Sequence, residues 1–351
     1  MPSAAKWVES LSPWPAEFGL DRMRALLREL GDPQCAYPSI HVVGTNGKST
    51  AARTIEEYLA REGLAVGTYL SPHVRGWGER IRVGGAEADF DEAIARVREP
   101  AKRAGATQFE VLTAAALAAF AASGVEVAVV EAGLGGRHDA TNVIDARVVL
   151  LTNVGLEHTD VLGDTRNAIA REKLAVVRAG ALAVLPADEF ARMVPDARVV
   201  LGGAREAAAA FLGREVDGHV EVALPGRLER RGEDEVWDGA HNAEGLAWSL
   251  PRLPHRRYTV VASILEDKDV DLMLDRLAAV SDRLVATRSS NTRALPAREL
   301  AARARGRFAS IEAVENPEAA LALAREDPPV LVTGSLYLLA DLTAREEQGI
   351  K

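Results

Sequence analysis

A short glycine-containing stretch between two apolar segments constrains this chain more than any other feature. It reads Gly44-Thr45-Asn46-Gly47-Lys48-Ser49-Thr50 and follows the β-branched pair Val42-Val43. The two glycines permit a tight turn, and an amphipathic run containing Ile55 and Leu59 comes next. In a phosphate-binding site, a strand leads into a glycine loop, a lysine, a hydroxyl residue and a helix, and backbone N–H groups face the anion. The stretch therefore predicts a nucleotide phosphate loop.

The spacing of this loop differs from the usual one. The standard phosphate loop is G-x-x-x-x-G-K-[ST], whereas Gly44 and Gly47 give the shorter G-x-x-G-K-[ST]. An ordinary turn between a strand and a helix is the alternative, because the first N–H groups of any helix need partners.

Length and composition limit the remaining possibilities. A chain of 351 residues is long enough for two domains, and a net charge of −9 argues against a nucleic-acid partner. The single cysteine, Cys35, excludes a disulfide framework and a cysteine-based metal site. The N-terminus lacks the apolar core of a signal peptide, and Ser123-Gly124 and Glu126 interrupt the longest apolar run, 111–130. We therefore expect a cytoplasmic protein with no membrane segment.

Apolar runs with strand and helix periodicity alternate along the chain, which predicts an α/β protein. We expect an N-terminal domain over 1–224 with a P-loop-type, mostly parallel sheet, and a smaller, Rossmann-like C-terminal domain over 228–351, joined by a linker at about 225–227. The expected strands are 41–43, 64–70, 126–131, 148–152, 181–185 and 216–224, then 235–238, 258–263, 283–287, 309–312 and 329–333. The expected helices are 17–31, the run after the glycine loop, 90–103, 109–122, 164–179, 204–210, 242–251, 269–279, 296–304, 316–324 and 335–345.

Several polar side chains follow the ends of the expected strands. In open α/β sheets, ligands bind beyond the carboxyl ends of the strands. If the strands are neighbours, Ser71, Glu131 and His158 converge near Lys48 and Ser49. Hydroxyl and carboxylate oxygens suit Mg²⁺, whereas an imidazole ligand is less usual and indicates a second metal position.

The order of short motifs extends this pattern over nearly the whole chain, from about residue 17 to 345. They are Gly44–Lys48, Ser71-Pro72-His73, Glu131–Asn142, His158 with Leu162–Thr165, Glu172-Lys173, Pro225–Arg227, Asp238–Asn242, Asp267–Asp269 and Thr333–Tyr337. In this order they resemble the folylpolyglutamate synthase/dihydrofolate synthase family of the Mur ligase superfamily.

The resemblance implies an ATP-dependent ligase of the acid–amino-acid class. Such an enzyme phosphorylates the carboxylate of a reduced folate or of dihydropteroate, and the amine of L-glutamate attacks the acyl phosphate. By the same resemblance, residues Gly44 to Thr50 bind the ATP phosphates, and Ser49, Ser71, Glu131 and His158 bind Mg²⁺. It assigns catalytic roles to Lys48, Lys173 and His158, and it implies a monomer.

Three further sets of roles come from the resemblance. Lys173 matches a lysine that the family carries as a carbamate; the alternative is a helix-surface lysine paired with Glu172 or Glu157. Nucleotide contacts are assigned to Arg227, Asp238 and His241, although His241 is alternatively a capping or packing residue. Folate is assigned to Phe109, Arg137 and Asp139, with core packing as the alternative for Phe109.

The sequence departs from the family pattern in two places. Lys48 is followed directly by Ser49-Thr50, where the family usually has a glycine between lysine and serine, so either hydroxyl is a candidate metal ligand. The family's adenine-contacting asparagine has no counterpart between Asn167 and Asn242. Two other functions stay open: a peptidoglycan-type Mur ligase and a nucleotide-binding switch without ligase chemistry.

Overall fold

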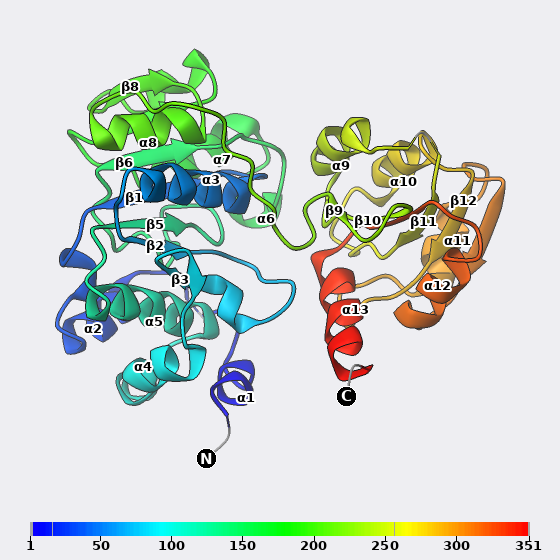
Figure 1. Ribbon diagram of the computed structural model, residues 1–351, viewed down its shortest axis with the longest axis horizontal. Coiled ribbons are helices and arrows are strands. Elements are labelled where there is room, and N and C mark those ends of the chain that lie inside the picture. The colour runs from blue at the N-terminus through cyan, green and yellow to red at the C-terminus, as the bar shows by residue number, and fades with distance from the viewer. Residues whose placement is uncertain (1–2, 16, 256, 350–351) are drawn as a thin grey trace. The chain divides into compact units, whose positions relative to one another are not determined.

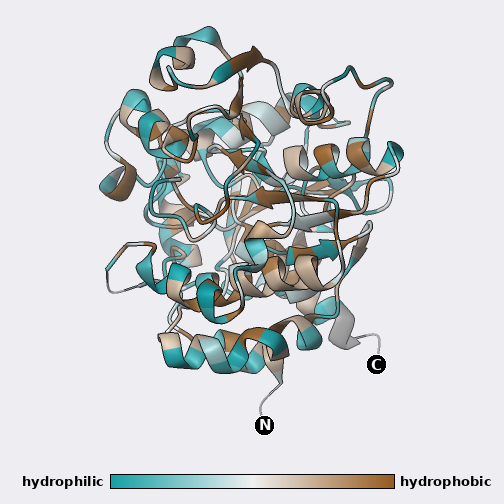
Figure 2. Ribbon diagram, turned by 90° about the vertical axis from the view of Figure 1, so that its left-hand side faces the viewer, coloured by the Kyte–Doolittle hydropathy of each residue, from teal (hydrophilic) through white to brown (hydrophobic). Residues whose placement is uncertain are grey.

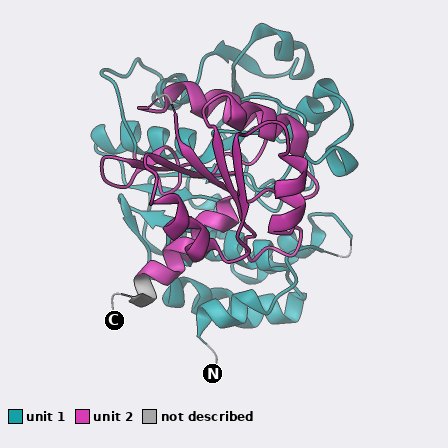
Figure 3. Ribbon diagram, turned by 90° about the vertical axis from the view of Figure 1, so that its right-hand side faces the viewer, with its two compact units in different colours: residues 1–73, 77–222 teal, residues 74–76, 223–351 magenta. Residues whose placement is uncertain are grey.

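The chain forms two compact units in a computed structural model that describes residues 3–15, 17–255 and 257–349. Unit 1 comprises residues 1–73 and 77–222, and unit 2 comprises residues 74–76 and 223–351 (Figure 3). The division falls two residues before the end of the expected N-terminal domain at 224. The assignment of Val74–Gly76 to unit 2 has no counterpart in the sequence pattern, because a three-residue exchange leaves no periodic signal.

Unit 1 is built on one sheet of eight strands in the order β4-β3-β2-β5-β1-β6-β7-β8. Its strands are β1 (Ser39–Val43), β2 (Val66–Tyr69), β3 (Ile81–Val83), β4 (Ala86–Glu87), β5 (Val127–Glu131), β6 (Val148–Leu151), β7 (Leu182–Leu185) and β8 (Arg198–Leu201). The six strands from β2 to β8 in this order pair in parallel, whereas β3 and β4 form an antiparallel hairpin at one edge. The expected α/β fold with a mostly parallel sheet is confirmed.

Helices and short 3-10 segments connect these strands (Figure 1). They are α1 (Ala4–Glu9), α2 (Asp21–Glu29), η1 (Pro33–Cys35), α3 (Lys48–Arg61), η2 (Trp77–Arg80), α4 (Phe90–Ala104), α5 (Gln108–Ala122), α6 (Thr159–Leu162), α7 (Arg166–Leu174), η3 (Asp188–Met193) and α8 (Ala204–Leu212).

Strand β1 lies at the centre of the unit 1 sheet, between β5 and β6. Val42 pairs with Glu131 of β5, and Val43 pairs with Leu151 of β6. All five residues of β1 are buried, as in a parallel sheet covered on both faces. The segments that follow β1, β5 and β6 therefore leave the same edge of the sheet from neighbouring positions.

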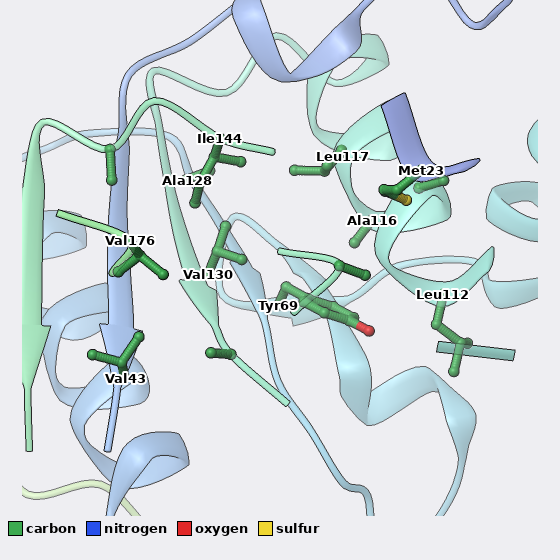
Figure 4. Close-up of a cluster of buried hydrophobic side chains, with 14 of the residues drawn as sticks. Met23, Val43, Tyr69, Leu112, Ala116, Leu117, Ala128, Val130, Ile144 and Val176 are labelled. Carbon is green, nitrogen blue, oxygen red and sulfur yellow. The ribbon is translucent and has the colours of Figure 1, made fainter. Parts of the chain in front are cut away.

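The core of unit 1 lies between this sheet and its helices (Figure 4). Met23 of α2 and Leu112 of α5 pack in the same buried cluster as Val130 of β5. Helix α5 is buried along most of its length, so its apolar residues cover several turns rather than one face. It begins with a capping box, in which Thr107 and Glu110 bond to each other's backbone N–H groups.

Unit 2 contains a second sheet of six strands in the order β13-β12-β11-β14-β10-β9. Its strands are β9 (Glu229–Arg230), β10 (Glu235–Trp237), β11 (Thr259–Ala262), β12 (Arg283–Ala286), β13 (Ser310–Ala313) and β14 (Val330–Thr333). The helices are α9 (Ala243–Ser249), η4 (Leu250–Arg252), α10 (Val270–Ala278), α11 (Ala297–Arg303), α12 (Pro317–Ala324) and α13 (Leu336–Gly349). Only β9 pairs antiparallel, so the expected second α/β domain is confirmed.

One expected strand is wrong, and the sequence pattern did not predict strands β8 and β9. Residues 216–224 form no strand, because Gly218 has a φ of 78° and side chains of α3 bond the local carbonyls. Tyr58 Oη donates to the Gly218 carbonyl at 3.1 Å, and Arg61 donates to that of His219 at 3.3 Å. Strand β8 instead completes the sheet, and its ends are exposed at the edge.

The expected helix 164–179 is shorter than its periodicity indicated. It runs from Arg166 to Leu174 as α7, and Thr165 caps its start by accepting from the N–H of Ala168. The short helix α6 precedes it. This shortening places Arg178 after the helix rather than in it.

Hydropathy along the described residues agrees with these layers. Helices in Figure 2 change between hydrophilic and hydrophobic colours along their turns, as amphipathic helices do. Among the described residues, no helix is long and apolar enough to span a bilayer.

Candidate functional site

The glycine loop after β1 is fixed by the segment that follows β6. Gly47 has a φ of 78° and precedes the first residue of α3, a conformation that glycine adopts without strain. The Thr45 N–H donates to the Asn153 carbonyl at 3.1 Å, and the Asn46 N–H donates to the Asn153 side chain at 2.9 Å. Thr152 donates from its hydroxyl to the Asn46 carbonyl at 2.8 Å. The loop shape therefore depends on Thr152 and Asn153, whose part the sequence pattern did not reveal.

Three residues from three different elements meet beside the start of α3. The Ser49 hydroxyl donates to Glu131 Oε1 at 3.0 Å, and the Ser71 N–H donates to Glu131 Oε2 at 3.0 Å. Glu131 is only 1% exposed, and Ser49 and Ser71 are 9% exposed. A buried carboxylate is costly unless hydrogen bonds or a cation compensate it. Of the residues expected to converge, Ser71 and Glu131 therefore meet beside Ser49. Ser49 rather than Thr50 is the hydroxyl that contacts the carboxylate.

Two lysines donate hydrogen bonds to carbonyls of the glycine loop. Lys48 donates to the Thr45 carbonyl at 3.2 Å, and Lys173 donates to the Gly44 carbonyl at 3.0 Å and to Glu157 Oε1 at 2.7 Å. The Lys173 side chain is 1% exposed, so the alternative of a helix-surface lysine is wrong, although its pairing with Glu157 is observed. Glu172 pairs instead with Arg137.

Burial and charge oppose each other in the Lys173–Glu157 pair. Burial lowers the pKa of Lys173, and the carboxylate of Glu157 partly offsets this effect. Burial alone would raise the pKa of Glu157, but the cations of Lys48 and Lys173 bring it down to about 2. Glu157 is therefore an anion at neutral pH. From the sequence, Glu157 is only a possible partner of Lys173, although Glu157 directly precedes His158.

His158 is the N-cap residue of the short helix α6 (Thr159–Leu162) and has a φ of 46°. Its ring contributes to the low pKa of Glu157, the residue directly before it in the chain. Among the described residues, no three His, Cys, Asp or Glu side chains gather as a metal cluster. A cation at this edge would therefore need hydroxyl and phosphate oxygens besides the Glu131 carboxylate.

The loop from Gly133 to Asn142 carries two of the expected folate residues. Arg137 is 54% exposed and donates to Glu172 Oε2 at 3.1 Å. Asp139 is buried, and its carboxylate accepts hydrogen bonds from the N–H groups of Leu134 and Thr141 at 2.7 and 3.0 Å. Burial raises the pKa of Asp139, whereas these hydrogen bonds lower it. Within the structure Asp139 organises its own loop, while Arg137 points a guanidinium toward solvent.

Phe109, the third expected folate residue, stands at the start of α5. Its ring centroid lies 6.1 Å from that of Tyr69, and a Cβ added to Gly133 would come within 2.5 Å of the Phe109 ring. Phe109 is partly buried against the core. The structure thus gives it core contacts and leaves part of its ring accessible.

A buried histidine, His41, also supports the loop from Gly133 to Asn142. Nε2 of His41, in β1, lies 2.8 Å from the Thr141 hydroxyl, and Thr141 donates in turn to Asp139. Because the single hydroxyl proton goes to the carboxylate, His41 carries its proton on Nε2. Burial, with a smaller contribution from Arg178, lowers the pKa of His41 to about 3. The sequence did not predict these hydrogen bonds between His41, Thr141 and Asp139, because His41 has the pattern of an ordinary strand residue.

The expected nucleotide residues of unit 2 lie around the end of β10. The carboxylate of Asp238 accepts from the N–H groups of Leu228 at 3.0 Å and Ala240 at 3.2 Å. Arg227 donates to the Gly226 carbonyl at 3.2 Å. Nδ1 of His241 lies 3.0 Å from the Gly239 carbonyl, and Asn242 caps α9 by accepting from the Gly245 N–H. These contacts fix the turn that leads into α9.

Comparison with known proteins agrees with this architecture in both units. A family model described as the Mur ligase middle domain matches residues 42–216, and one described as the Mur ligase, glutamate ligase domain matches residues 226–336. The glycine loop with its buried Glu131, together with these two domain matches, defines a Mur ligase, an ATP-dependent ligase of the acid–amino-acid class.

Individual relatives narrow this class. A dihydrofolate synthase/folylpolyglutamate synthase of Mycobacterium tuberculosis is 33% identical over 390 aligned residues, which cover 84% of this chain and 80% of the relative. The chain therefore belongs to the folylpolyglutamate synthase/dihydrofolate synthase family, as the order of the motifs predicted.

Two solved structures resemble the chain over nearly its full length. Escherichia coli FolC in complex with DHPP and ADP has a TM-score of 0.88 and 28% identity, and the match covers 100% of both chains. A bifunctional folylpolyglutamate synthase/dihydrofolate synthase with Mn, AMPPNP and L-glutamate bound has a TM-score of 0.85 and 28% identity, with 99% of this chain and 98% of that chain covered.

Proposed function

We propose that this protein joins L-glutamate to the carboxylate of a reduced folate, of dihydropteroate or of both, at the expense of ATP. A carboxylate oxygen attacks the γ-phosphorus of ATP and ADP leaves, which gives an acyl phosphate. The glutamate amine then attacks the acyl carbon, and the tetrahedral intermediate expels inorganic phosphate. The observation that carries the proposal is the buried Glu131 carboxylate, bonded to Ser49 and Ser71 at the edge of the glycine loop.

The glycine loop would bind the phosphates of ATP. Its residues, Gly44 to Thr50, include the start of α3, whose first backbone N–H groups favour an anion. The Lys48 ammonium adds a positive charge on the same loop, where it would balance charge that develops during phosphoryl transfer. We assign His158 a supporting position beside the lysines, consistent with its electrostatic effect on Glu157.

The residues beside the loop fit a magnesium ion. Mg²⁺ prefers oxygen ligands and retains several waters, and Glu131, Ser49 and Ser71 offer carboxylate and hydroxyl oxygens close together. We propose that these three residues hold Mg²⁺ and that His158 serves a second metal position. When bound, the ion neutralises charge on the transferred phosphoryl group.

Lys173 is the residue for which we propose a carbamate. The lowered pKa of its amine raises the fraction of neutral amine, which is the form that reacts with CO₂. The unmodified side chain already pairs with Glu157, so a carbamate requires Glu157 to turn away or to accept a proton.

Incubation with ¹³CO₂ tests the carbamate directly. We expect a ¹³C carbamate resonance from the wild-type protein and none from Lys173→Arg, which keeps the positive charge. Identical spectra from the two proteins would show that Lys173 is not modified.

The roles proposed for the substrate-binding and nucleotide-binding residues rest on the family resemblance together with the exposure of each side chain. Arg137 and Phe109 are at least partly accessible, so we propose that they contact the substrate's carboxylate and ring, respectively. Asp139 would contribute indirectly, by fixing the conformation of the loop that carries Arg137. In unit 2 we propose that Arg227, Asp238 and His241 serve the nucleotide. We further propose a cytoplasmic monomer with domains at 1–224 and 228–351.

Phosphate release separates this function from its alternatives. We expect release of phosphate from ATP only when L-glutamate and either dihydropteroate or tetrahydrofolate are both present. A nucleotide-binding switch would hydrolyse ATP without either compound, and a peptidoglycan-type Mur ligase would require a uridine nucleotide substrate instead. Testing dihydropteroate and tetrahydrofolate separately decides whether one or both are substrates.

A further inference from the structure

Unit 1 contains a cavity of about 560 Å³, and of its lining residues only Arg137 has a role in the proposed reaction. Residues of α7 line one side, and the segment 192–197 lines another. The remaining lining comes from Arg137 and from residues 177–179, which follow α7. The cavity is therefore formed within one unit by neighbouring segments of the chain.

The lining of this cavity is strongly basic, although the whole chain has a net charge of −9. Its charged side chains are four arginines, Arg137, Arg171, Arg178 and Arg192, and one carboxylate, Asp196. Within the described part of the chain, Arg171 and Arg192 have no ion pair, and Arg178 bonds only to neutral oxygens of Ala175 and Asn142. Three guanidinium groups without a carboxylate partner at one cavity favour an anionic ligand.

The cavity lies on a different face of α7 from the proposed catalytic lysine. Asn167, Arg171, Leu174 and Ala175 line it with spacings of four, three and one residues, which is one face of a helix. Lys173 is excluded from this face and reaches the Gly44 carbonyl instead. An anion in the cavity would therefore not occupy the phosphate loop.

Hydrogen bonds connect the cavity to the loop that carries Arg137. Arg178 donates to the Asn142 side-chain oxygen at 2.7 Å, and the Asn142 amide donates to the Arg137 carbonyl at 2.8 Å. Arg137 is itself one of the residues that line the cavity. A ligand that extends from the substrate-binding loop would meet this basic cavity next.

We propose that the cavity binds the oligo-γ-glutamyl tail of folates that already carry several glutamates. This inference rests on the proposed function, whose product gains a carboxylate with each glutamate added. A cavity of 560 Å³ exceeds what a single phosphate needs, and arginines spaced around it suit several carboxylates on a flexible chain. Arg171 and Arg192 supply positive charge for the carboxylates of the tail. Arg137 would be the first of these arginines that the tail meets on its way from the reacting end of the substrate.

Direct binding of γ-linked pentaglutamate, which lacks a pterin, tests the site without catalysis. Titration calorimetry on the full-length wild-type protein should detect binding that weakens with added salt. The double variant Arg171→Ala/Arg192→Ala should bind at least about tenfold more weakly, because two charge-assisted contacts are lost. Arg198→Ala removes an exposed arginine of β8 outside the cavity and should bind like the wild type.

The same proteins then distinguish a tail from a phosphate ligand. Tripolyphosphate binding that is lost in the double variant, without binding of pentaglutamate, would overturn the assignment to a tail. Equal pentaglutamate affinity in wild type and double variant would overturn the site.

Kinetics separate this proposal from the proposed function. In the double variant the KM for a pentaglutamyl folate should rise about tenfold, while the KM for the monoglutamyl form stays unchanged. If the wild type turns over the monoglutamyl form and the double variant shows no change in either KM, the tail site fails and the ligase function stands. If the wild type shows no glutamate-dependent turnover at all, the ligase function fails.

Discussion

Lys48 and Lys173 bring two positive charges to one glycine loop, but their surroundings differ. Lys173 is buried and neutralised by Glu157, whereas Lys48 donates to the neutral carbonyl of Thr45. The charge of Lys48 is therefore the one that remains available to a phosphate. A substitution of Lys48 therefore tests the phosphate-binding role of the loop more directly than a substitution of Lys173.

Replacing Lys48 by alanine should abolish turnover while the fold persists. We expect kcat to fall at least about 100-fold, because a lost charge at a transferring phosphoryl group costs several kcal/mol. Lys102→Ala, which removes a surface lysine of α4, serves as the control and should retain full activity. Near-normal turnover by Lys48→Ala, with an unchanged circular dichroism spectrum, would refute the assigned role.

The buried His41 should make the free energy of unfolding depend on pH in the acidic range. Its pKa is about 3 in the folded protein and ordinarily 6.5, so the unfolded state binds more protons between these values. The free energy of unfolding should therefore decrease as pH falls from 6.5 toward 3, by up to about 1.4 kcal/mol per pH unit from His41 alone. Above pH 6.5 this contribution is constant.

Denaturant unfolding of wild type and His41→Gln at pH 7, 6 and 5 measures this contribution. The wild type should lose stability more steeply than the variant, because glutamine does not titrate. His73, whose pKa is also lowered to about 3, remains in both proteins and cancels in the comparison. Parallel pH dependences would mean that His41 titrates normally in the folded state.

At the scale of elements, the loop 133–142 is pressed against α7. A Cβ added to Gly136 would come within 2.5 Å of the Lys173 carbonyl oxygen and 2.7 Å of that of Glu172. The Arg137 N–H donates to the same Glu172 carbonyl at 3.1 Å. Glycine is therefore required here by the close approach of two backbones.

Gly136→Ala should separate the loop from α7. We expect a loss of about 1–3 kcal/mol in unfolding free energy, as is typical of overpacked sites, together with a raised KM for the folate substrate as Arg137 moves. Gly19→Ala adds the same methyl group where no atom lies within 4 Å and should change neither quantity. Wild-type stability and KM in Gly136→Ala would show that the loop adjusts freely.

Elements with strong periodicity were predictable, and those fixed by tertiary contacts were not. Strand β5 and helix α5 are long, apolar and bounded by polar residues, so the sequence located both within one or two residues. Residues 216–224 carry strand-like valines but bond to Tyr58 and Arg61 of α3. No local sequence pattern predicts such contacts. The short edge strand β8 likewise has no clear strand periodicity in the sequence.

For the whole molecule, the sequence supplied the candidate residues and the fold supplied their contacts. The motif spacing predicted that Ser71 and Glu131 meet. Glu131 ends β5 and Ser71 follows β2, and these two strands are adjacent and parallel. The sequence left open whether Glu172 or Glu157 pairs with Lys173, and it could not reveal that His41 supports Asp139 through Thr141. These contacts depend on side-chain packing between segments far apart in sequence.

The central claim is that the γ-phosphoryl group of ATP passes to a folate carboxylate before glutamate attacks. A substrate whose reacting carboxylate is labelled with ¹⁸O tests it, with mass spectrometry of the released phosphate. The acyl phosphate mechanism predicts one ¹⁸O atom from the substrate in each phosphate released with amide formation, because the C–O bond breaks when glutamate attacks. Phosphate without label, or label recovered in AMP, would contradict the account.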